Sequence, residues 1–431
     1  SDVAPRFGFA WSPRSQNDLS IRGGFGVYYD RFSSRFANLQ VFNYPYDVVA
    51  AGAFSAGFFS IPFPNPGTTF PLPAQAPSPL LLPFDGIPIG TNPINGFFAA
   101  PNMKTPYTMD YNFDVQYSFA NSWLMDIGYV GNRGNHLINL YNFNQGLAGP
   151  PAAPYAADGF SDNKALFGFD QVQTEAESRY NALQTSLTKH FNHGLQFLAS
   201  YTWSHSIDNN SGDNTPNAES ELEPLPGDQQ NLRSQFGNSD FDRKHRFVFS
   251  GVYDLPKFYD GSGLAKSLAN NWETNGLVVL QTGLPYTVYC SNGSDLNNRA
   301  DLTGQPTVTS SGSTVSRLTD YFNPAAFAYC TDANNVPPFG TSPRNFLRGP
   351  GQKNVDFSVV KFFPITEISK IEFRAEFFNI FNFVNFGQPY TNTLSVLNPS
   401  TSALQFAGPV GAITQTAASP RIIQFALKYN F

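Results

Sequence analysis

One oxygen-rich segment comes nearest to a metal site in residue type and spacing. It covers residues 208–213, with the sequence DNNSGD, and carboxylate, amide and hydroxyl oxygens are ligands that Ca²⁺ prefers. The segment lacks the twelve-residue spacing of an EF-hand and its terminal bidentate Glu. Acidic residues in a hydrated, turn-rich loop explain the same pattern. We therefore predict a surface loop at 208–213, with Ca²⁺ binding as the alternative.

Two cysteines, Cys290 and Cys330, fall in one irregular region of the chain. A disulfide between them would fit an oxidising compartment such as the periplasm or the cell surface. Two free thiols are the alternative. A metal site would need more ligands nearby, so the sequence favours a Cys290–Cys330 disulfide.

Catalytic and cofactor motifs are missing from the sequence. None of the five histidines shows HxH or HxxxH spacing, and no serine lies in a GxSxG elbow. Residues 22–26, RGGFG, lack the lysine of a phosphate loop and lie within a strand pattern. No spacing reveals the carboxylate pair of a glycosidase. We expect no enzyme, no catalytic residue, no cofactor and no bound metal.

Charges at every second position mark a segment near the C-terminus. Glu372, Arg374 and Glu376 alternate with apolar residues, so a strand would place all three on one face. That face would meet water in a soluble sandwich, whereas in a wide barrel it would line the lumen. We predict lumen-facing ion pairs, with substrate or plug contacts as the alternative. Lys361 and Lys428 are predicted to face the lumen likewise.

Strands are needed to position these charges, and period-two alternation is the main pattern of the chain. Over residues 109–119 the odd positions are apolar or aromatic and the even positions are polar. A helix would scatter the two sets over all its faces, and about eleven residues suit a tilted membrane strand. Comparable alternation covers 19–29, 123–130, 195–203, 247–255 and 371–377.

The last segment alternates in the same way and stops on an aromatic residue. Outer-membrane barrels typically end so, because the last strand pairs with the first and its terminal aromatic lies in the interfacial girdle. We predict that this segment is the closing strand and is the part that the barrel assembly machinery would contact. Its apolar face consists of Ile423, Phe425, Leu427, Tyr429 and Phe431.

Short and long connections alternate between the predicted strands. A barrel has short turns on the periplasmic side and long loops outside, and a compact soluble domain would not readily carry several loops of such length. The short connections lie near 13–18, 120–122, 191–194 and 365–369. The long connections lie at about 30–105, 132–175, 207–242 and 290–352.

The composition also favours a two-faced sheet. Of 431 residues only 13% are charged and 16% are aromatic, yet the mean hydropathy is −0.26. The net charge of −6 argues against nucleic-acid binding. The apolar runs are too short for a membrane helix, which needs about 20 residues, so a closed barrel remains as the way to cross a bilayer.

These patterns together predict an all-β protein, an antiparallel transmembrane β-barrel of about 10–14 strands. It would have long extracellular loops and short periplasmic turns and would lie in outer-membrane lipid. Residues 1–431 would form a single domain, the C-terminal part of a larger barrel whose plug and N-terminal domain are absent from this chain. The rival hypothesis is a secreted or surface all-β adhesin or binding protein, with its aromatic residues buried between two sheets.

An ordered series of short segments carries a resemblance to a known family. The series resembles the C-terminal barrel portion of TonB-dependent outer-membrane receptors of the Oar-like type, which carry a carboxypeptidase-regulatory-like domain at the N-terminus. The segments are APRFGFAW at 4–11, IRGGFGVYYD at 21–30, QTGLPY at 281–286, YFNP at 321–324, RNFLRGPG at 344–351, RAEFFNIFN at 374–382 and PRIIQFALKYNF at 420–431.

The resemblance implies a barrel of about 22 strands with a plugged lumen and substrate uptake across the outer membrane. Energy would come through TonB, which would be contacted only by an N-terminal part absent from this chain. This chain alone is therefore not expected to perform gated uptake. The resemblance says little about the substrate.

Overall fold

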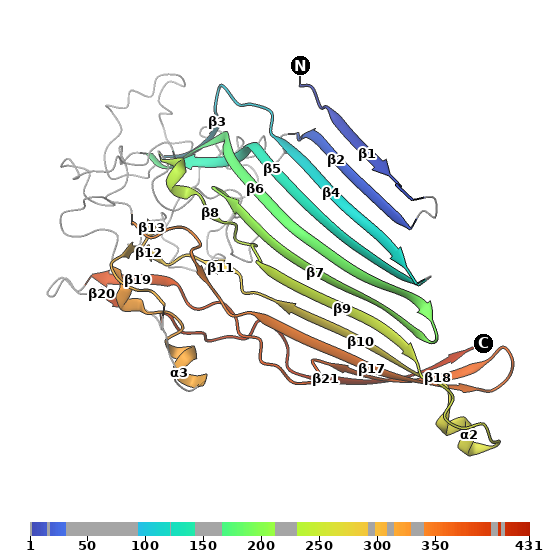
Figure 1. Cartoon of the computed structure of the whole chain (residues 1–431). Coiled ribbons are helices and arrows are strands. Elements are labelled where there is room, and N and C mark those ends of the chain that lie inside the picture. The colour runs from blue at the N-terminus through green and yellow to red at the C-terminus, as the bar shows by residue number, and fades with distance from the viewer. Residues whose placement is uncertain are drawn as a thin grey trace, which may run out of the picture.

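One sheet of 13 strands, antiparallel in all but one of its strand pairings, dominates the computed structural model of the chain. Its strands lie side by side as a curved, slanted wall (Figure 1). The prediction of an all-β antiparallel fold is confirmed. The structure describes residues 2–14, 18–31, 94–120, 122–142, 166–211, 231–291, 298–307, 314–328, 340–397, 404–406 and 410–431.

Eleven of the strands form a continuous antiparallel path, mostly in sequence order, which lies within the predicted number. Two more attach beside it: β3 (Ile94–Ala99) pairs with β6, and β8 (Gly237–Asn238) pairs with β7. The path runs through β1 (Arg6–Trp11), β2 (Leu19–Tyr29), β4 (Tyr107–Phe119), β5 (Trp123–Asn142), β6 (Leu166–Asn192), β7 (Leu195–Asp208), β9 (His245–Asp254), β10 (Trp272–Gln281), β17 (Gln352–Pro364), β18 (Lys370–Phe378) and β21 (Ile422–Asn430).

The sheet is open within the described residues. β1 pairs only with β2, and β21 pairs only with β18, so these two strands form opposite edges. The final strand is present as the sequence predicted, but the pairing that would close it onto the first strand is not made in this part of the chain. Both edges therefore present unpaired backbone groups.

Connections of different length gather at the two ends of the sheet. The turns 120–122, 193–194 and 365–369 lie at one end, together with the 255–271 connection that carries α2 (Leu264–Ala269) (Figure 1). We call this the short-turn end. The described residues of the long connections lie at the opposite, long-loop end.

Two strands extend further than the sequence predicted. The expected long loop at 132–175 is partly strand, because β5 continues to Asn142 and β6 begins at Leu166. Bulges interrupt their register near Gly134 and Leu137, and His136 has a φ of 54°. These irregularities, with few apolar residues, hide the strand pattern. A 13-residue strand such as β4 already spans about 40 Å at 3.3 Å per residue, so β5 and β6 reach beyond their neighbours.

The long-loop end carries short sheets and helices of its own, which we call the loop cluster and define as the described residues of the 282–351 and 379–421 connections. Small pairings build it, β11–β16, β14–β15 and β13–β12–β19–β20. Its elements are β11 (Pro285–Tyr286), β12 (Tyr289–Ser291), β13 (Asn298–Arg299), β14 (Asp301–Leu302), α3 (Thr314–Thr319), η4 (Pro324–Ala326), β15 (Phe327–Ala328), β16 (Leu347–Arg348), β19 (Asn392–Leu397) and β20 (Leu404–Phe406). A further short helix, η3 (Leu232–Gln235), lies in the connection before β8.

The hydrophobic core lies in the loop cluster and not behind the large sheet. Among the described residues, the other sheets have only two or four strands, and many large apolar side chains of the 13-stranded sheet are exposed. That arrangement lacks the packed pair of sheets a soluble sandwich needs. No helix in the described ranges is long and apolar enough to cross a bilayer. The buried core residues are Tyr286, Val288, Ala300, Phe322, Ala326, Phe327, Leu347 and Val410.

Candidate functional site

The strand register sorts the side chains of the large sheet into two faces of opposite character, since directly paired residues point to the same side. One row across seven strands is almost wholly apolar and defines the apolar face: Tyr117, Met125, Leu187, Ala199, Phe249, Val278 and Val355. A row on the other side is polar apart from one glycine and defines the polar face: Arg22, Asp114, Gly128, Gln184, Thr202, Arg246, Gln281 and Gln352.

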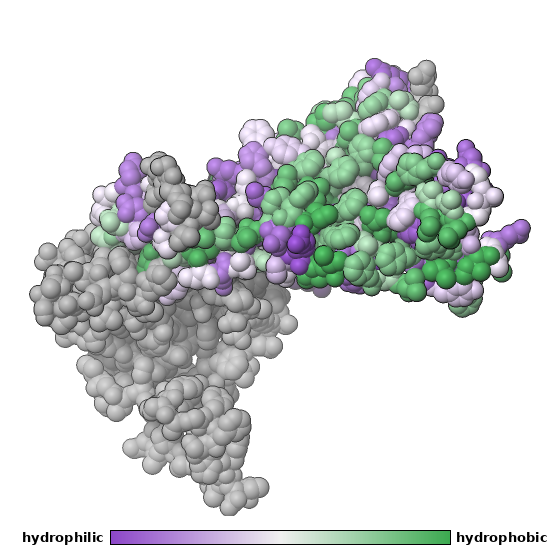
Figure 2. All heavy atoms as spheres, turned by 90° about the horizontal axis from the view of Figure 1, so that it is seen from below, coloured by the Kyte–Doolittle hydropathy of each residue, from purple (hydrophilic) through white to green (hydrophobic). Residues whose placement is uncertain are grey.

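Figure 2 shows hydrophobic side chains gathered over one surface of the described strands. The predicted closing strand contributes to the apolar side. Its members Phe425, Leu427 and Tyr429 are exposed, and each pairs with an apolar residue of β18. Ile423 and Phe431 are exposed as well.

The four charged residues singled out by the sequence lie together on the polar face. Arg374 contacts Glu372 at 2.5 Å and Glu376 at 3.4 Å. Lys428 lies directly opposite Glu372 in the register, and Asn430 Nδ2 donates to Glu372 Oε2 at 3.3 Å. Their charges thus offset one another across β18 and β21, which suits a structural ion-pair set.

Lys361 does not belong to this set, and the prediction that it faces the lumen is wrong. It pairs with Trp272 on one side and Phe373 on the other, so it lies on the apolar face. Its ammonium group lies over the Trp272 ring, 5.1 Å from the centroid, and donates to the backbone carbonyl of Asn270. A long side chain can reach the margin of an apolar surface in this way.

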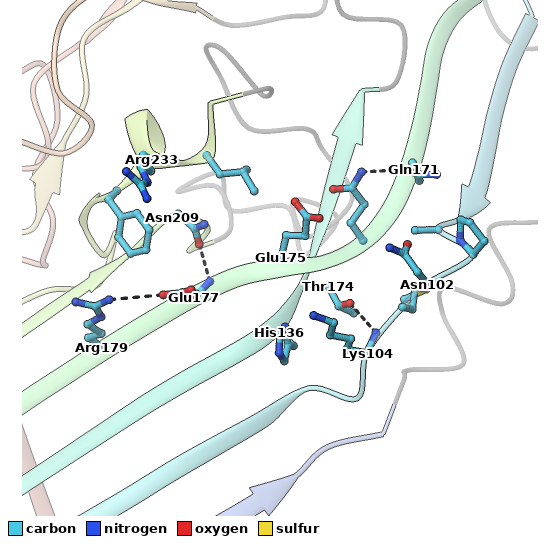
Figure 3. A pocket seen from close by; sticks show the side chains of 16 residues that line it. Asn102, Lys104, His136, Gln171, Thr174, Glu175, Glu177, Arg179, Asn209 and Arg233 are labelled. Carbon is cyan, nitrogen blue, oxygen red and sulfur yellow. Dashed lines mark hydrogen bonds and ion pairs between the residues drawn. The ribbon is translucent and has the colours of Figure 1, made fainter. Parts of the chain in front are cut away.

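A hollow at the long-loop end is the best candidate for a ligand site (Figure 3). It has a volume of about 570 Å³ and is formed by the extended part of β6, by residues 100–104 and by η3. Its lining is mainly polar, with amides, hydroxyls and charges of both signs. Such a lining can bind a small polar solute through hydrogen bonds, and it shows no arrangement suited to covalent catalysis.

Part of this lining is fixed by internal contacts. Thr174 Oγ1 accepts from the backbone N–H of Lys104 at 2.9 Å, and Asn209 Oδ1 accepts from that of Glu177 at 2.7 Å. Arg179 pairs with Glu177 at 3.6 Å and lies over the Phe236 ring. These contacts hold the walls in place.

Other charges in the lining have no side-chain partner in the described part of the chain. They are the Glu175 carboxylate, the Lys104 ammonium group and the Arg233 guanidinium. In Figure 3 Lys104 and Arg233 lie on opposite sides of Glu175. The hollow therefore offers both an anionic and a cationic group to a ligand.

A buried polar network ties the loop cluster to the end of β7, and we call it the latch. Arg344 Nη2 lies 2.7 Å from Asp208 Oδ1, with both side chains almost fully buried. Arg348 pairs with the buried carboxylate of Asp242. Asn345 Nδ2 donates to the Asn238 carbonyl at 2.8 Å. The segment 344–348 thus docks on Asp208, Asn238 and Asp242, which are far from it in sequence.

The prediction of a hydrated surface loop at 208–213 is wrong for Asp208 and Asn209, which are each 2% exposed, because the latch buries this end of β7. The Asp208 carboxylate accepts from Arg344 and from Ser211 Oγ, so a calcium ion at 208–213 would have to compete with the guanidinium. Gly212 and Asp213 lie outside the described residues. Among the described residues no group of three or more His, Cys, Asp or Glu is arranged to hold a metal.

The predicted Cys290–Cys330 disulfide cannot be placed. Cys330 and the side chain of Cys290 lie outside what the structure describes.

Two tyrosines connect the loop-cluster core to the latch. Burial raises the pKa of the Tyr286 and Tyr321 phenols in the loop-cluster core. Tyr321 still donates to the Arg348 carbonyl at 3.2 Å, so the core and the latch are in direct contact.

Comparison with known proteins gives one decisive match. The sequence profile of the family described as "Outer membrane beta barrel domain" matches residues 1–424. None of the curated protein sequences is significantly similar to the chain.

Several solved structures also align with the chain, at low identity. The outer membrane transporter YddB from Escherichia coli aligns at 9% identity with a TM-score of 0.49, covering 100% of this chain and 40% of that one. The FrpB iron transporter from Neisseria meningitidis aligns at 9% identity and 0.42, covering 100% and 39%. The ferric citrate transporter FecA aligns at 10% and 0.40, covering 99% and 38%. The chain thus spans about 40% of the length of the first of these structures.

Proposed function

Because the chain belongs to the family of outer membrane β-barrel domains and therefore lies in the outer membrane, we propose that it forms part of the wall of a TonB-dependent receptor that takes up substrate. The observation that carries the proposal is the two-faced single-layered sheet. An apolar row crosses seven strands on one face, and a polar row crosses the same strands on the other. Lipid would cover the first face, and the second would line the lumen.

The open edges support a wall that is completed by further strands. Unpaired backbone groups are too costly to leave exposed within a bilayer, and both β1 and β21 have one unpaired edge in the described residues. A larger barrel would pair both edges. In that receptor, TonB and a plug would act through a part outside this chain, and the barrel assembly machinery would recognise β21.

The hollow beside β6 would capture the substrate before it enters the lumen. It lies at the long-loop end, which would face the outside. Glu175, Lys104 and Arg233 offer it charges of both signs, which suits a polar solute with hydrogen-bonding groups and not an apolar one. Binding would raise the unfolding temperature of the complete protein, and a panel of oligosaccharides and short peptides can be screened for that shift. A true ligand must lose its effect in a Glu175→Leu variant.

The lipid-facing assignment can be tested in the complete gene product reconstituted in vesicles. A nitroxide placed at Leu187 lies on the apolar row, and one placed at the neighbouring Ser186 lies on the opposite face. We expect the Leu187 label to collide mainly with oxygen dissolved in lipid and the Ser186 label mainly with a water-soluble nickel chelate. Equal access at both positions would contradict the barrel wall.

The transport assignment needs a second measurement. The periplasmic domain of TonB, immobilised on resin, should retain the complete gene product from detergent extracts. Failure of that retention, with normal membrane insertion, would overturn the receptor proposal and leave a barrel of another kind. A protein that stays dissolved without detergent would instead support the adhesin alternative.

A further inference from the structure

The 255–271 connection presents a group of apolar side chains that no step above uses. It joins β9 to β10 at the short-turn end and includes α2 (Figure 1). Leu264 is 75% exposed and Leu268 is 52% exposed, and residues four apart lie on the same side of a helix. Phe258 and Tyr259, just before the helix, are 61% and 45% exposed.

This connection is held in one conformation by a buried amide. Asn270 is 3% exposed, and its Oδ1 accepts from the backbone N–H groups of Phe258 at 2.8 Å and Tyr259 at 3.1 Å. Its Nδ2 donates to the Tyr259 carbonyl at 2.6 Å. These hydrogen bonds fix the backbone of residues 258–259, so the exposure of the Phe258 and Tyr259 side chains is a property of the folded connection.

Side chains of the apolar face hold the end of α2. Trp272 Nε1 donates to the Leu268 carbonyl at 2.8 Å, and Lys361 donates to the Asn270 carbonyl. Trp272 and Lys361 pair directly in the register, on the face that carries Phe249 and Val278. The C-terminal end of α2 therefore lies against the margin of the lipid-facing surface and continues it.

A second tryptophan and lysine mark the same margin on other strands. Lys189 lies over the Trp123 ring, 5.0 Å from the centroid, and donates to Ser122 Oγ at 3.3 Å. The Trp123 ring stacks on Phe119 and meets the Phe197 ring edge to face. Tryptophan together with a lysine that reaches toward water is typical of the height at which a bilayer meets water.

We propose that α2 and the residues before it form an interfacial anchor whose occupant is the periplasmic phospholipid leaflet of the outer membrane. Leu264 and Leu268 insert between the lipids, and Lys257 faces their anionic headgroups. The proposal rests on the membrane orientation given above. Continuity with the apolar face favours lipid over a protein partner, because a partner would have to displace lipid at the same margin.

The test uses the complete gene product in vesicles of phosphatidylethanolamine and phosphatidylglycerol, with Cys290 and Cys330 replaced by serine. A fluorophore is attached at Leu264→Cys, at Leu268→Cys or at Lys266→Cys, which lies on the other side of α2. Quenching is measured with a nitroxide on the upper part of the acyl chain. Labels on the inserted side should be quenched at least about twofold more than the Lys266 label, because interfacial helices bury one face about 5–10 Å deep.

Two controls separate the anchor from the barrel itself. A label at Ile127→Cys, on the apolar face, must be quenched by a nitroxide near the chain terminus, and a label at Glu367→Cys, in the 365–369 turn, must stay accessible to aqueous iodide. If both hold and Leu264 and Leu268 are quenched no more than Lys266, the anchor is overturned. If Ile127 is not quenched, the membrane orientation fails first and the anchor falls with it.

Discussion

Replacing Arg344 with methionine is expected to release the loop cluster from β7 while the large sheet stays assembled. The guanidinium donates to Asp208 Oδ1 at 2.7 Å, to the Asp208 carbonyl at 2.8 Å and to Ser211 Oγ at 2.6 Å. Without it the Asp208 carboxylate stays buried with only the Ser211 hydroxyl as a side-chain donor. Removing one partner of a buried ion pair costs about 3–5 kcal/mol. At about 1.4 kcal/mol per factor of ten, the cluster should open a hundredfold to several thousandfold more often.

Hydrogen exchange in outer-membrane vesicles measures that opening. The amide of Ala300, which donates to the Val288 carbonyl at 3.0 Å inside the loop-cluster core, should exchange faster by the same factor. Amides in the paired middle of β5 and β6 should keep their rates, since they do not depend on the latch. The expected pattern is therefore local loss of protection and not general unfolding.

Matched variants decide whether the buried charge is the cause. Arg14→Met removes an exposed pair with Asp18 and should change exchange rates by less than about tenfold, because surface pairs contribute about 0–1 kcal/mol. Asp208→Asn combined with Arg344→Met should recover part of the protection, since no buried charge remains. Unchanged exchange at Ala300 in the Arg344→Met variant, or no recovery in the double variant, would refute this reasoning.

Three further predictions concern the sheet and the loop cluster. Ile127→Arg places a charge on the apolar face and should cost about 2–4 kcal/mol of folding free energy in lipid, whereas Ser186→Arg on the polar face should be nearly neutral; urea unfolding in vesicles compares them. Burial raises the pKa of Tyr286, so its contribution to stability is complete below about pH 10 and should fall above that pH as the unfolded phenol ionises, by about 1.4 kcal/mol per pH unit; Tyr286→Phe should remove this part of the alkaline sensitivity of loop-cluster exchange. Gly340→Ala should loosen the cluster, because a Cβ there would lie 1.6 Å from the Arg299 carbonyl oxygen, and protease nicking of the loops in intact cells would report it.

The sequence was sufficient for the strands because water and lipid act on alternate residues. At 109–119 every odd residue is apolar or aromatic and every even one polar, and β4 covers that segment. Alternation does not reveal strands whose two faces are both in a polar environment. Residues 136–142 of β5 and the start of β6 extend beyond the paired end of β4, so neither face is selected to be apolar. The sequence there predicts a loop.

The loop cluster and the hollow could not be predicted for a different reason. Arg344 and Asp208 are 136 residues apart, and no local periodicity connects them. The RNFLRGPG segment contributes to the family resemblance, but its sequence does not show that its two arginines, four residues apart, each bind an aspartate of the latch. Two arginines in a turn-rich segment and several aspartates in another indicate that ion pairs could form. Their positions in the sequence do not indicate which arginine pairs with which aspartate.

Lys361 shows what decides orientation in such a sheet. Its charge suggested the polar face, yet residues 355–363 alternate so that Val355, Phe357, Val359, Lys361 and Phe363 share one side. The phase of the alternation therefore predicts its orientation correctly and its charge does not. A lysine costs little on the lipid side if it lies near a strand end, because its stem stays in the apolar layer and its ammonium group reaches the margin. Glu372 has no such reach, and its partners Arg374 and Lys428 lie on the polar face with it. Short charged side chains are thus the better markers of the lumen, and lysines of this sheet must be placed by their neighbours.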